Sequence, residues 1–184
     1  MGRLKPRGNN SVRIIGGRCR SRVLHFPDLP GLRPTPDRVR ETLFNWLGQR
    51  LEGLSCLDAF AGSGALGCEA ASRGAARVVM LEQERRAFDA LLNNVQSLAL
   101  AGVEVLRRDA QSYLASARET FDLIFLDPPF SDNLLPGILP LAATLLAPDG
   151  RIYAESPAPL APVDMTVLRQ GRAGQSHFCL LELA

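Results

Sequence analysis

Short apolar segments alternate with helix-forming segments through most of the chain. The apolar segments "SCLDAF", "ARVVMLEQ", "VEVLRRD" and "FDLIFLD" lie between residues 55 and 127, and a helical pattern separates each one from the next. Parallel strands need a crossover connection, which is usually a helix, so this alternation builds a parallel sheet with helices on its faces. The chain is therefore predicted to have an α/β fold.

The segments at either end complete this prediction. A helix over residues 132–146 and the strand "GRIYAES" follow, and "VDMTVLRQ" with "SHFCLLEL" predicts an antiparallel C-terminal hairpin, which makes about seven strands. Near the N-terminus, "VRIIGG" and "SRVLHFP" predict a short hairpin or a pair of extended segments, whereas residues 1–11 are predicted to be disordered. In "RPTPDRVRETLFNWLGQRLEG", Thr35 is the expected N-cap of a helix and Pro36 its first residue.

Positive charge is concentrated near the N-terminus. Residues 1–40 carry ten Arg or Lys and two Asp, a net charge of +8, whereas the rest of the chain carries eleven basic and seventeen acidic residues, a net charge of −6. A basic arm on an acidic body is expected of a protein whose arm meets a polyanion, although such an arm can also serve solubility alone. We therefore predict a basic arm and hairpin over residues 1–36 and a second domain over residues 37–184.

Composition and spacing exclude several classes of protein. No apolar run approaches the roughly 20 residues needed to cross a bilayer, and the first residues lack the apolar core of a signal peptide, so a cytoplasmic protein is expected. The four cysteines show no C-x-x-C spacing, which favours buried reduced thiols over disulfides or metal ligands. His25 and His177 have no Cys, His or acid at metal-ligand spacing, so no metal is predicted.

A glycine-rich turn, "LDAFAGSGALG", follows the first strand of the predicted parallel sheet. Gly62, Gly64 and Gly67 match the pattern G-x-G-x-x-G, in which glycines let a ligand approach the backbone beside a helix N-terminus. Glu82 lies 20 residues beyond Gly62, where an acid binds ribose hydroxyls. This pattern by itself fits NAD as well as S-adenosylmethionine.

The acid at the start of this turn favours S-adenosylmethionine. A pyrophosphate would be repelled by the carboxylate of Asp58, whereas the ammonium and sulfonium groups of S-adenosylmethionine would be attracted to it. Asp58, Glu82, Asp109 and Asp127 each follow one of four successive strands, and ligands of open α/β sheets bind at that carboxyl edge. We expect Glu82 to accept from the ribose and Asp109 from the adenine amino group. Each acid, taken alone, could instead be an ordinary helix N-cap.

The tetrapeptide "DPPF" at residues 127–130 predicts a reaction at a base amine. Such an amine is a poor nucleophile because its lone pair is delocalised into the ring. Asp127 and the carbonyl of Pro128 could each accept one N–H and turn the lone pair toward a methyl donor, while Phe130 stacks on the base. Pro128 and Pro129 hold the backbone rigid, which a simple strand-ending turn would also require.

The order of these motifs resembles a known family. "DAFAGSGALG", "LEQ", "RRDA" and "LDPPF" are similar to the motifs of class I S-adenosylmethionine-dependent methyltransferases, and "RIIGGRCRSRVLHFP" with "RPTPDRVRETLFNWL" resembles the RsmD family of 16S ribosomal RNA (guanine-N2)-methyltransferases. The resemblance covers nearly the whole chain. It implies a Rossmann-like, seven-stranded, mostly parallel sheet, and transfer of a methyl group to N2 of one guanine in 16S ribosomal RNA, within the small ribosomal subunit or its assembly intermediate.

The resemblance also implies roles for individual residues, and a protein that acts as a monomer. Ser21 and Pro36 depart from the family pattern, which has glycine and a second Thr at these positions, and both departures bear on RNA docking rather than on methyl transfer. The expected cofactor-binding residues are Asp58, Phe60, Gly62, Gly64, Glu82, Gln83, Asp109 and Ala110; the catalytic residues are Asp127, Pro128, Pro129 and Phe130; and the RNA-binding residues are Arg18, Arg20, Arg33, Arg38 and Arg40.

Three alternatives are weighed against this prediction. An NAD-dependent oxidoreductase is disfavoured by Asp58 and by the absence of a candidate proton donor. A catalytically silent RNA-binding protein would use the basic arm and keep the glycine turn for structure only. An adenine-N6 methyltransferase acting on DNA or another RNA would use "DPPF" equally well, so only the N-terminal resemblance favours ribosomal RNA.

Overall fold

The computed structural model describes residues 10–184, so most of the segment predicted to be disordered lies outside the described residues. Strand β1 (Asn10–Arg13) pairs antiparallel with β2 (Val23–Phe26), which confirms the predicted N-terminal hairpin. Asn10 and Ser11 belong to this pair, and their predicted disorder is therefore wrong. Their backbone is ordered by β2, which the local composition of the first residues does not show.

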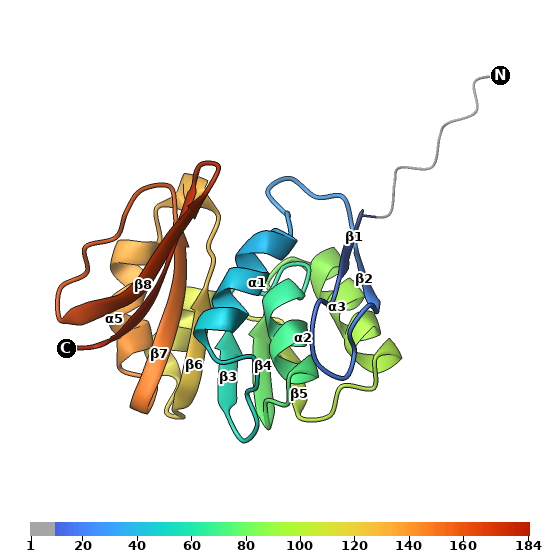
Figure 1. Cartoon of the computed structure of the whole chain (residues 1–184). Coiled ribbons are helices and arrows are strands. Elements are labelled where there is room, and N and C mark those ends of the chain that lie inside the picture. The colour runs from blue at the N-terminus through green and yellow to red at the C-terminus, as the bar shows by residue number, and fades with distance from the viewer. Residues whose placement is uncertain (1–9) are drawn as a thin grey trace.

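Seven further strands form one sheet in the order β5-β4-β3-β6-β7-β9-β8 (Figure 1). Strands β5, β4, β3, β6 and β7 pair in parallel, and β9 runs antiparallel to both β7 and β8. This arrangement confirms the predicted α/β class and the antiparallel C-terminal hairpin. The strands are β3 (Ser55–Asp58), β4 (Arg77–Leu81), β5 (Val103–Leu106), β6 (Phe121–Leu126), β7 (Leu146–Ser156), β8 (Met165–Ala173) and β9 (Ser176–Leu183).

Helices cover both faces of the sheet. Figure 1 shows α1 and α2 in front of the central strands and α5 behind β7. The helices are α1 (Asp37–Trp46), α2 (Ala65–Ser72), α3 (Arg85–Ser97), α4 (Ala110–Ser116) and α5 (Leu135–Ala143), with a short 3-10 helix, η1 (Phe130–Asp132), before α5. The helix predicted over residues 132–146 is shorter than expected, because Asn133 has a left-handed φ of 45° and Leu146 already belongs to β7.

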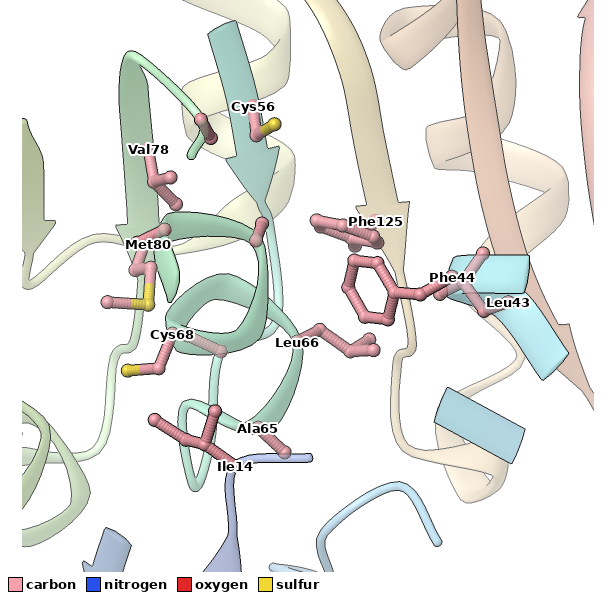
Figure 2. Packing of buried hydrophobic residues seen from close by; sticks show 14 of the residues in the cluster. Ile14, Leu43, Phe44, Cys56, Ala65, Leu66, Cys68, Val78, Met80 and Phe125 are labelled. Atoms are coloured by element: carbon pink, nitrogen blue, oxygen red, sulfur yellow. The ribbon is translucent and has the colours of Figure 1, made fainter. Parts of the chain in front are cut away.

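Neighbouring residues of each central strand enter opposite cores, as the pleat of a strand requires. In β4, Val78 and Met80 pack in the core with α1, α2 and α3, whereas Val79 and Leu81 pack in the core with α4 and α5. Figure 2 shows the first of these cores, in which side chains of α1, α2 and the strands meet. Burial on both faces explains why the strands are apolar at nearly every position. All four cysteines are free and buried, as predicted.

The N-terminal hairpin is packed into the first core. Val12 and Leu24 are buried in the same cluster as the apolar residues of α1, α2 and α3. The side chain of Asn94, in α3, accepts from the backbone N–H of His25 at 3.1 Å and donates to the His25 carbonyl at 2.8 Å. Within residues 10–184, the hairpin and the rest of the chain therefore share one core, and the packing shows no boundary at residue 36.

A buried ion-pair network ties the hairpin, α1 and α2 together. Glu69, in α2, accepts from Arg40 of α1 at 3.1 Å and from Arg73 at 2.8 Å. It also accepts the backbone N–H of Ile15, beyond the end of β1, at 2.9 Å. Because one carboxylate binds groups from the hairpin, from α1 and from the end of α2, it holds these three segments together.

The prediction that Arg40 contacts RNA is wrong. Its side chain is 0% exposed, and besides Glu69 it donates to the carbonyls of Thr35 and Arg13, at 3.1 and 2.8 Å. A buried guanidinium held by these partners cannot reach a phosphate group. The positive charge that seemed to belong to an RNA-binding surface instead stabilises the fold.

Candidate active site

A cavity of about 650 Å³ opens at the carboxyl edge of the parallel strands. The ends of β3, β4, β6 and β7, the residues after β5 and the segment before α1 all contribute to its lining. Ten residues predicted to bind the cofactor or to act in catalysis line it, together with Arg33 from the predicted RNA-binding set: Asp58, Phe60, Glu82, Gln83, Asp109, Ala110, Asp127, Pro128, Pro129 and Phe130. The topology thus brings together side chains that the sequence spaces over more than half of the chain.

The glycines of the turn after β3 shape the cavity without lining it. Gly62 and Gly64 have positive φ angles of 51° and 81°, a conformation that glycine adopts without strain. The N–H of Gly62 donates to Oε2 of Glu82 at 3.1 Å. A Cβ at Gly64 would lie 2.5 Å from Cδ1 of Leu91 in α3. These two glycines therefore set the path of the turn and the close approach of α3.

Asp58 is a buried carboxyl group at the end of β3. It is 2% exposed, and its Oδ2 accepts the backbone N–H of Gly67 at 2.9 Å. A Cβ at Gly67 would lie 2.4 Å from Sδ of Met80, so the close packing of α2 against β4 needs glycine at this position. Burial raises the pKa of Asp58 to about 7, although the N–H groups of Gly67 and Phe60 oppose the change. A cationic group bound beside Asp58 would favour its ionised form.

Glu82 and Asp109 are the other two acids predicted to hold a cofactor. Glu82 uses one carboxylate oxygen to accept from Gly62 and the other to accept the N–H of Glu84, at 2.8 Å. Burial raises the pKa of Glu82. Asp109 is the N-cap of α4, where its Oδ1 accepts the N–H of Ser112 at 2.8 Å. Asp109 therefore caps a helix and lines the cavity at once, so the two interpretations of this acid are compatible.

Asp127 follows β6 and is held by a residue from the other half of the chain. The hydroxyl of Thr35 donates to Oδ2 of Asp127 at 3.2 Å. The prediction that Thr35 caps α1 is wrong, because Pro36 holds the N-cap position with no side-chain hydrogen bond and Thr35 lines the cavity. Burial raises the pKa of Asp127 well above its usual range, and the nearby charge of Glu155 raises it further.

The chain continues from Asp127 through two prolines into η1. Pro129 occupies the N-cap position of this short helix, with φ of −54°. Phe130 follows it and is 39% exposed, although the ring is large and apolar. Because Phe130 also lines the cavity, its ring offers a flat apolar surface on which a base can stack.

The sequence analysis missed Glu155, near the end of β7. This side chain lines the cavity and is 4% exposed. Its Oε1 accepts from the hydroxyl of Tyr153 at 2.6 Å and its Oε2 from the hydroxyl of Ser176 at 2.9 Å. Burial raises the pKa of Glu155. The signal was present, because "GRIYAES" is a fifth parallel strand that also carries an acid, one residue before its last.

The exposed arginines of the predicted RNA-binding set lie in two places. Arg33 lines the cavity and an adjoining open groove of about 780 Å³, and Arg38 is exposed in the first turn of α1. Arg18 and Arg20 are also exposed, but the N–H of Arg18 donates to the carbonyl of Ser72 at the far end of α2. The eight residues of α2 make that end about 12 Å from the end beside the cavity. The structure does not bring these two arginines to the site.

Two kinds of feature are absent from residues 10–184: clusters of metal-ligating side chains and membrane-spanning helices. No group of three or more His, Cys, Asp or Glu side chains in this range is arranged to hold a metal ion. No helix in the same range is both long enough and apolar enough to span a membrane.

The chain is similar to known proteins over nearly its whole length. The protein family described as Conserved hypothetical protein 95 matches residues 12–182. Ribosomal RNA small subunit methyltransferase D of Escherichia coli strain K12 is 42% identical over 181 residues, which cover 95% of this chain and 91% of the relative. The protein of the same name from Haemophilus influenzae is 39% identical over 178 residues, which cover 92% of each chain. A solved structure of the Escherichia coli protein yhhF, described as a methyltransferase, has a TM-score of 0.84 and 41% identity, and covers 95% of this chain and 98% of its own.

Proposed function

This chain belongs to the RsmD family of ribosomal RNA small subunit methyltransferases, and on that premise we propose that it methylates the exocyclic N2 amine of one guanine in 16S ribosomal RNA. One observation supports the proposal above all: a buried Asp58, a buried Asp127 and an exposed Phe130 line the same cavity. The alternative, adenine-N6 methylation of DNA or another RNA, is not favoured, because the relatives are named for ribosomal RNA.

The cavity residues fit S-adenosylmethionine as the methyl donor. Its bound form supplies a methyl group activated by a positively charged sulfur. Asp58 would hold the ammonium group, Glu82 the ribose hydroxyls and Asp109 the adenine amino group, since carboxylates accept hydrogen bonds from all three. Phe60, Gln83 and Ala110 line the same cavity. The three residues that would hold the cofactor are all acids, which suits a cationic cofactor better than a dinucleotide with its pyrophosphate.

The target guanine would enter the cavity flipped out of its RNA helix, because an enzyme cannot reach a base amine inside the stack. Phe130 would stack on the base. Asp127 and the carbonyl of Pro128 would each accept one N2–H, which holds the amine lone pair toward the methyl group. The amine gains a methyl group and loses one proton, and Asp127 would take this proton because its raised pKa suits it to accept one.

RNA would approach over the segment that precedes α1. Arg33 and Arg38 are the exposed arginines of the predicted set on this segment and the first turn of α1, and they would contact phosphates around the flipped base. Arg18 and Arg20 would contact phosphates at a distance from the site. We propose that the substrate is the small ribosomal subunit or its assembly intermediate, and that the protein acts on it as a monomer in the cytoplasm.

The test of this function is methyl transfer from labelled S-adenosylmethionine to small subunits from cells that lack the endogenous enzyme. Nucleoside analysis of the RNA is expected to place the label in N2-methylguanosine. Label in N6-methyladenosine would overturn the proposed substrate and keep the chemistry. Protein that binds no S-adenosylmethionine would overturn the assignment of the cofactor residues.

The raised pKa of Asp58 predicts that cofactor binding depends on pH. The free protein holds a proton on Asp58 below pH 7, and a cationic ligand binds the ionised form, so binding must release that proton. The association constant for S-adenosylmethionine is therefore expected to rise with pH, by up to about tenfold per pH unit below pH 7, and to level off above it. Isothermal titration calorimetry between pH 5.5 and 7.5 measures this slope.

Asp58→Asn is the matched control for this measurement, because it keeps the shape of the side chain and removes its titration. The variant is expected to bind more weakly and to lose most of the slope; Glu82, whose pKa is also raised, accounts for what is left. A wild-type profile that is flat over this range would contradict the role of Asp58.

A further inference from the structure

Asp127 and Glu155 form a pair of buried acids on the wall of one cavity. The hydroxyl of Thr35 donates to Asp127 at 3.2 Å, and Leu126 of β6 pairs with Ala154 of β7, so Asp127 and Glu155 come next on two neighbouring parallel strands. The two residues are therefore neighbours at the carboxyl edge of the sheet. Burial raises the pKa of Asp127, and the charges of Glu155 and of Asp58, a third acid nearby, raise it further. Concentrating acids in this way is unfavourable for the free protein.

No ion pair compensates either acid within the described residues. The ion pairs of residues 10–184 involve other acids, namely Asp37, Glu69, Asp89, Glu104 and Glu119. Buried acids are normally paired with a base, because an unpaired buried charge is costly. The arrangement is therefore better explained by hydrogen-bond donors that arrive with a ligand.

Glu155 is fixed in place with capacity to accept further bonds. Tyr153 and Ser176 each donate a hydroxyl to one of its oxygens. Each carboxylate oxygen has two acceptor sites, so a third donor from the cavity can be accommodated. Hydroxyl donors on both oxygens hold the side chain in one orientation, which suits the recognition of a ligand of fixed shape.

Guanine presents the donors that this pair requires. Its N2 amine carries two N–H groups, and the adjacent ring nitrogen N1 carries another. Adenine also has an amine beside N1, but its N1 is an acceptor with no hydrogen. A carboxylate next to Asp127 would attract the N1–H of guanine and repel the lone pair of an unprotonated N1.

We propose that Glu155 is a specificity-determining residue that accepts the N1–H of the target guanine while Asp127 accepts an N–H of its N2 amine. The proposal rests on the proposed function and explains what that function leaves open: how a "DPPF" sequence, which can hold any base amine, selects guanine.

The test compares guanine with 2-aminopurine in the wild-type enzyme and in Glu155→Gln. The target nucleotide is first mapped in the product, and 16S RNA carrying 2-aminopurine at that position is reconstituted into small subunits. 2-Aminopurine keeps the N2 amine and its attachment to the ribose, but its N1 has no hydrogen. Wild-type kcat/KM is expected to be on the order of 100-fold higher for guanine. In Glu155→Gln this preference is expected to fall at least tenfold, because an amide can donate to N1 as well as accept from it.

The ratio of kcat/KM for guanine to kcat/KM for 2-aminopurine is compared between the wild type and Glu155→Gln. This comparison removes the effects that do not involve Glu155. 2-Aminopurine also lacks the O6 of guanine, but that loss is the same for both enzymes and cancels. Glu155→Asp retains a carboxylate and is expected to keep the preference for guanine at lower activity. A preference that is unchanged in Glu155→Gln overturns the proposal, and so does a wild-type enzyme that methylates both bases equally well. Failure of the wild type to methylate guanine would instead contradict the proposed function itself.

Discussion

Replacing Asp127 by alanine is expected to lower kcat for methyl transfer by about 10²–10⁴-fold. Alanine removes the acceptor that orients the amine and the group that takes its proton. Asp127 is placed to do both, because it lines the cavity and its buried carboxyl group has a raised pKa. Single-turnover transfer of labelled methyl groups to unmodified small subunits measures the loss.

Cofactor binding separates this catalytic effect from misfolding. The Asp127→Ala variant is expected to bind S-adenosylmethionine nearly as well as the wild type, since the cofactor is assigned to Asp58, Glu82 and Asp109. Asp127→Asn keeps an oxygen that can accept an N–H but cannot take a proton as readily, so its activity is expected to lie between the two. Asp89→Ala, on the exposed face of α3, is the control. Full activity in Asp127→Ala would show that the chemistry lies elsewhere.

Replacing Glu69 by glutamine is expected to destabilise the protein by about 3–5 kcal/mol. The substitution keeps the size of the side chain but removes the one carboxylate that Arg40, Arg73 and the N–H of Ile15 share. Among the described residues, Arg73 would then have no anion, and Arg40 would keep only Asp37, whose side chain is 60% exposed. Urea denaturation followed by circular dichroism measures the free energy of unfolding, and a loss this large is a substantial part of the roughly 5–15 kcal/mol of a typical domain.

Glu104→Gln is the matched control for this substitution. Glu104 pairs with Arg77 at 3.5 Å, but its side chain is 52% exposed, so water screens the pair. Its removal is expected to change the free energy of unfolding by less than about 1 kcal/mol. Equal effects of the two substitutions would mean that the buried network does not hold the hairpin, α1 and α2 together.

The sequence predicted the sheet well because its signals are local. Apolar residues at consecutive positions, as in "LIFL" at residues 123–126, indicate a strand buried on both faces, and β6 confirms this. Helices between such strands require parallel pairing, and parallel pairing places all carboxyl ends at one edge. The acids at the ends of β3, β4, β5 and β6 could therefore be assigned to one edge of the sheet from their positions along the chain.

Positions that depend on distant partners were predicted less well. Threonine is a common N-cap residue, but the hydroxyl of Thr35 donates to Asp127, 92 residues later. Arg40 lies in a basic segment, but Glu69, 29 residues away, draws it into the core. Arg18 and Arg20 belong to the same basic segment as Arg33, yet the docking of the hairpin turn on the end of α2 takes them away from the cavity.

The sequence by itself determined the fold class, the edge at which the site forms and the acids that line it, because strand patterns and crossovers follow from residues that are close along the chain. Only the tertiary structure decided which charges are buried, which hydroxyl holds Asp127 and that Glu155 joins it. Those contacts depend on how segments pack across the sheet. The free energy of each contact depends on how deeply its side chains are buried, and residues distant in the sequence determine that burial.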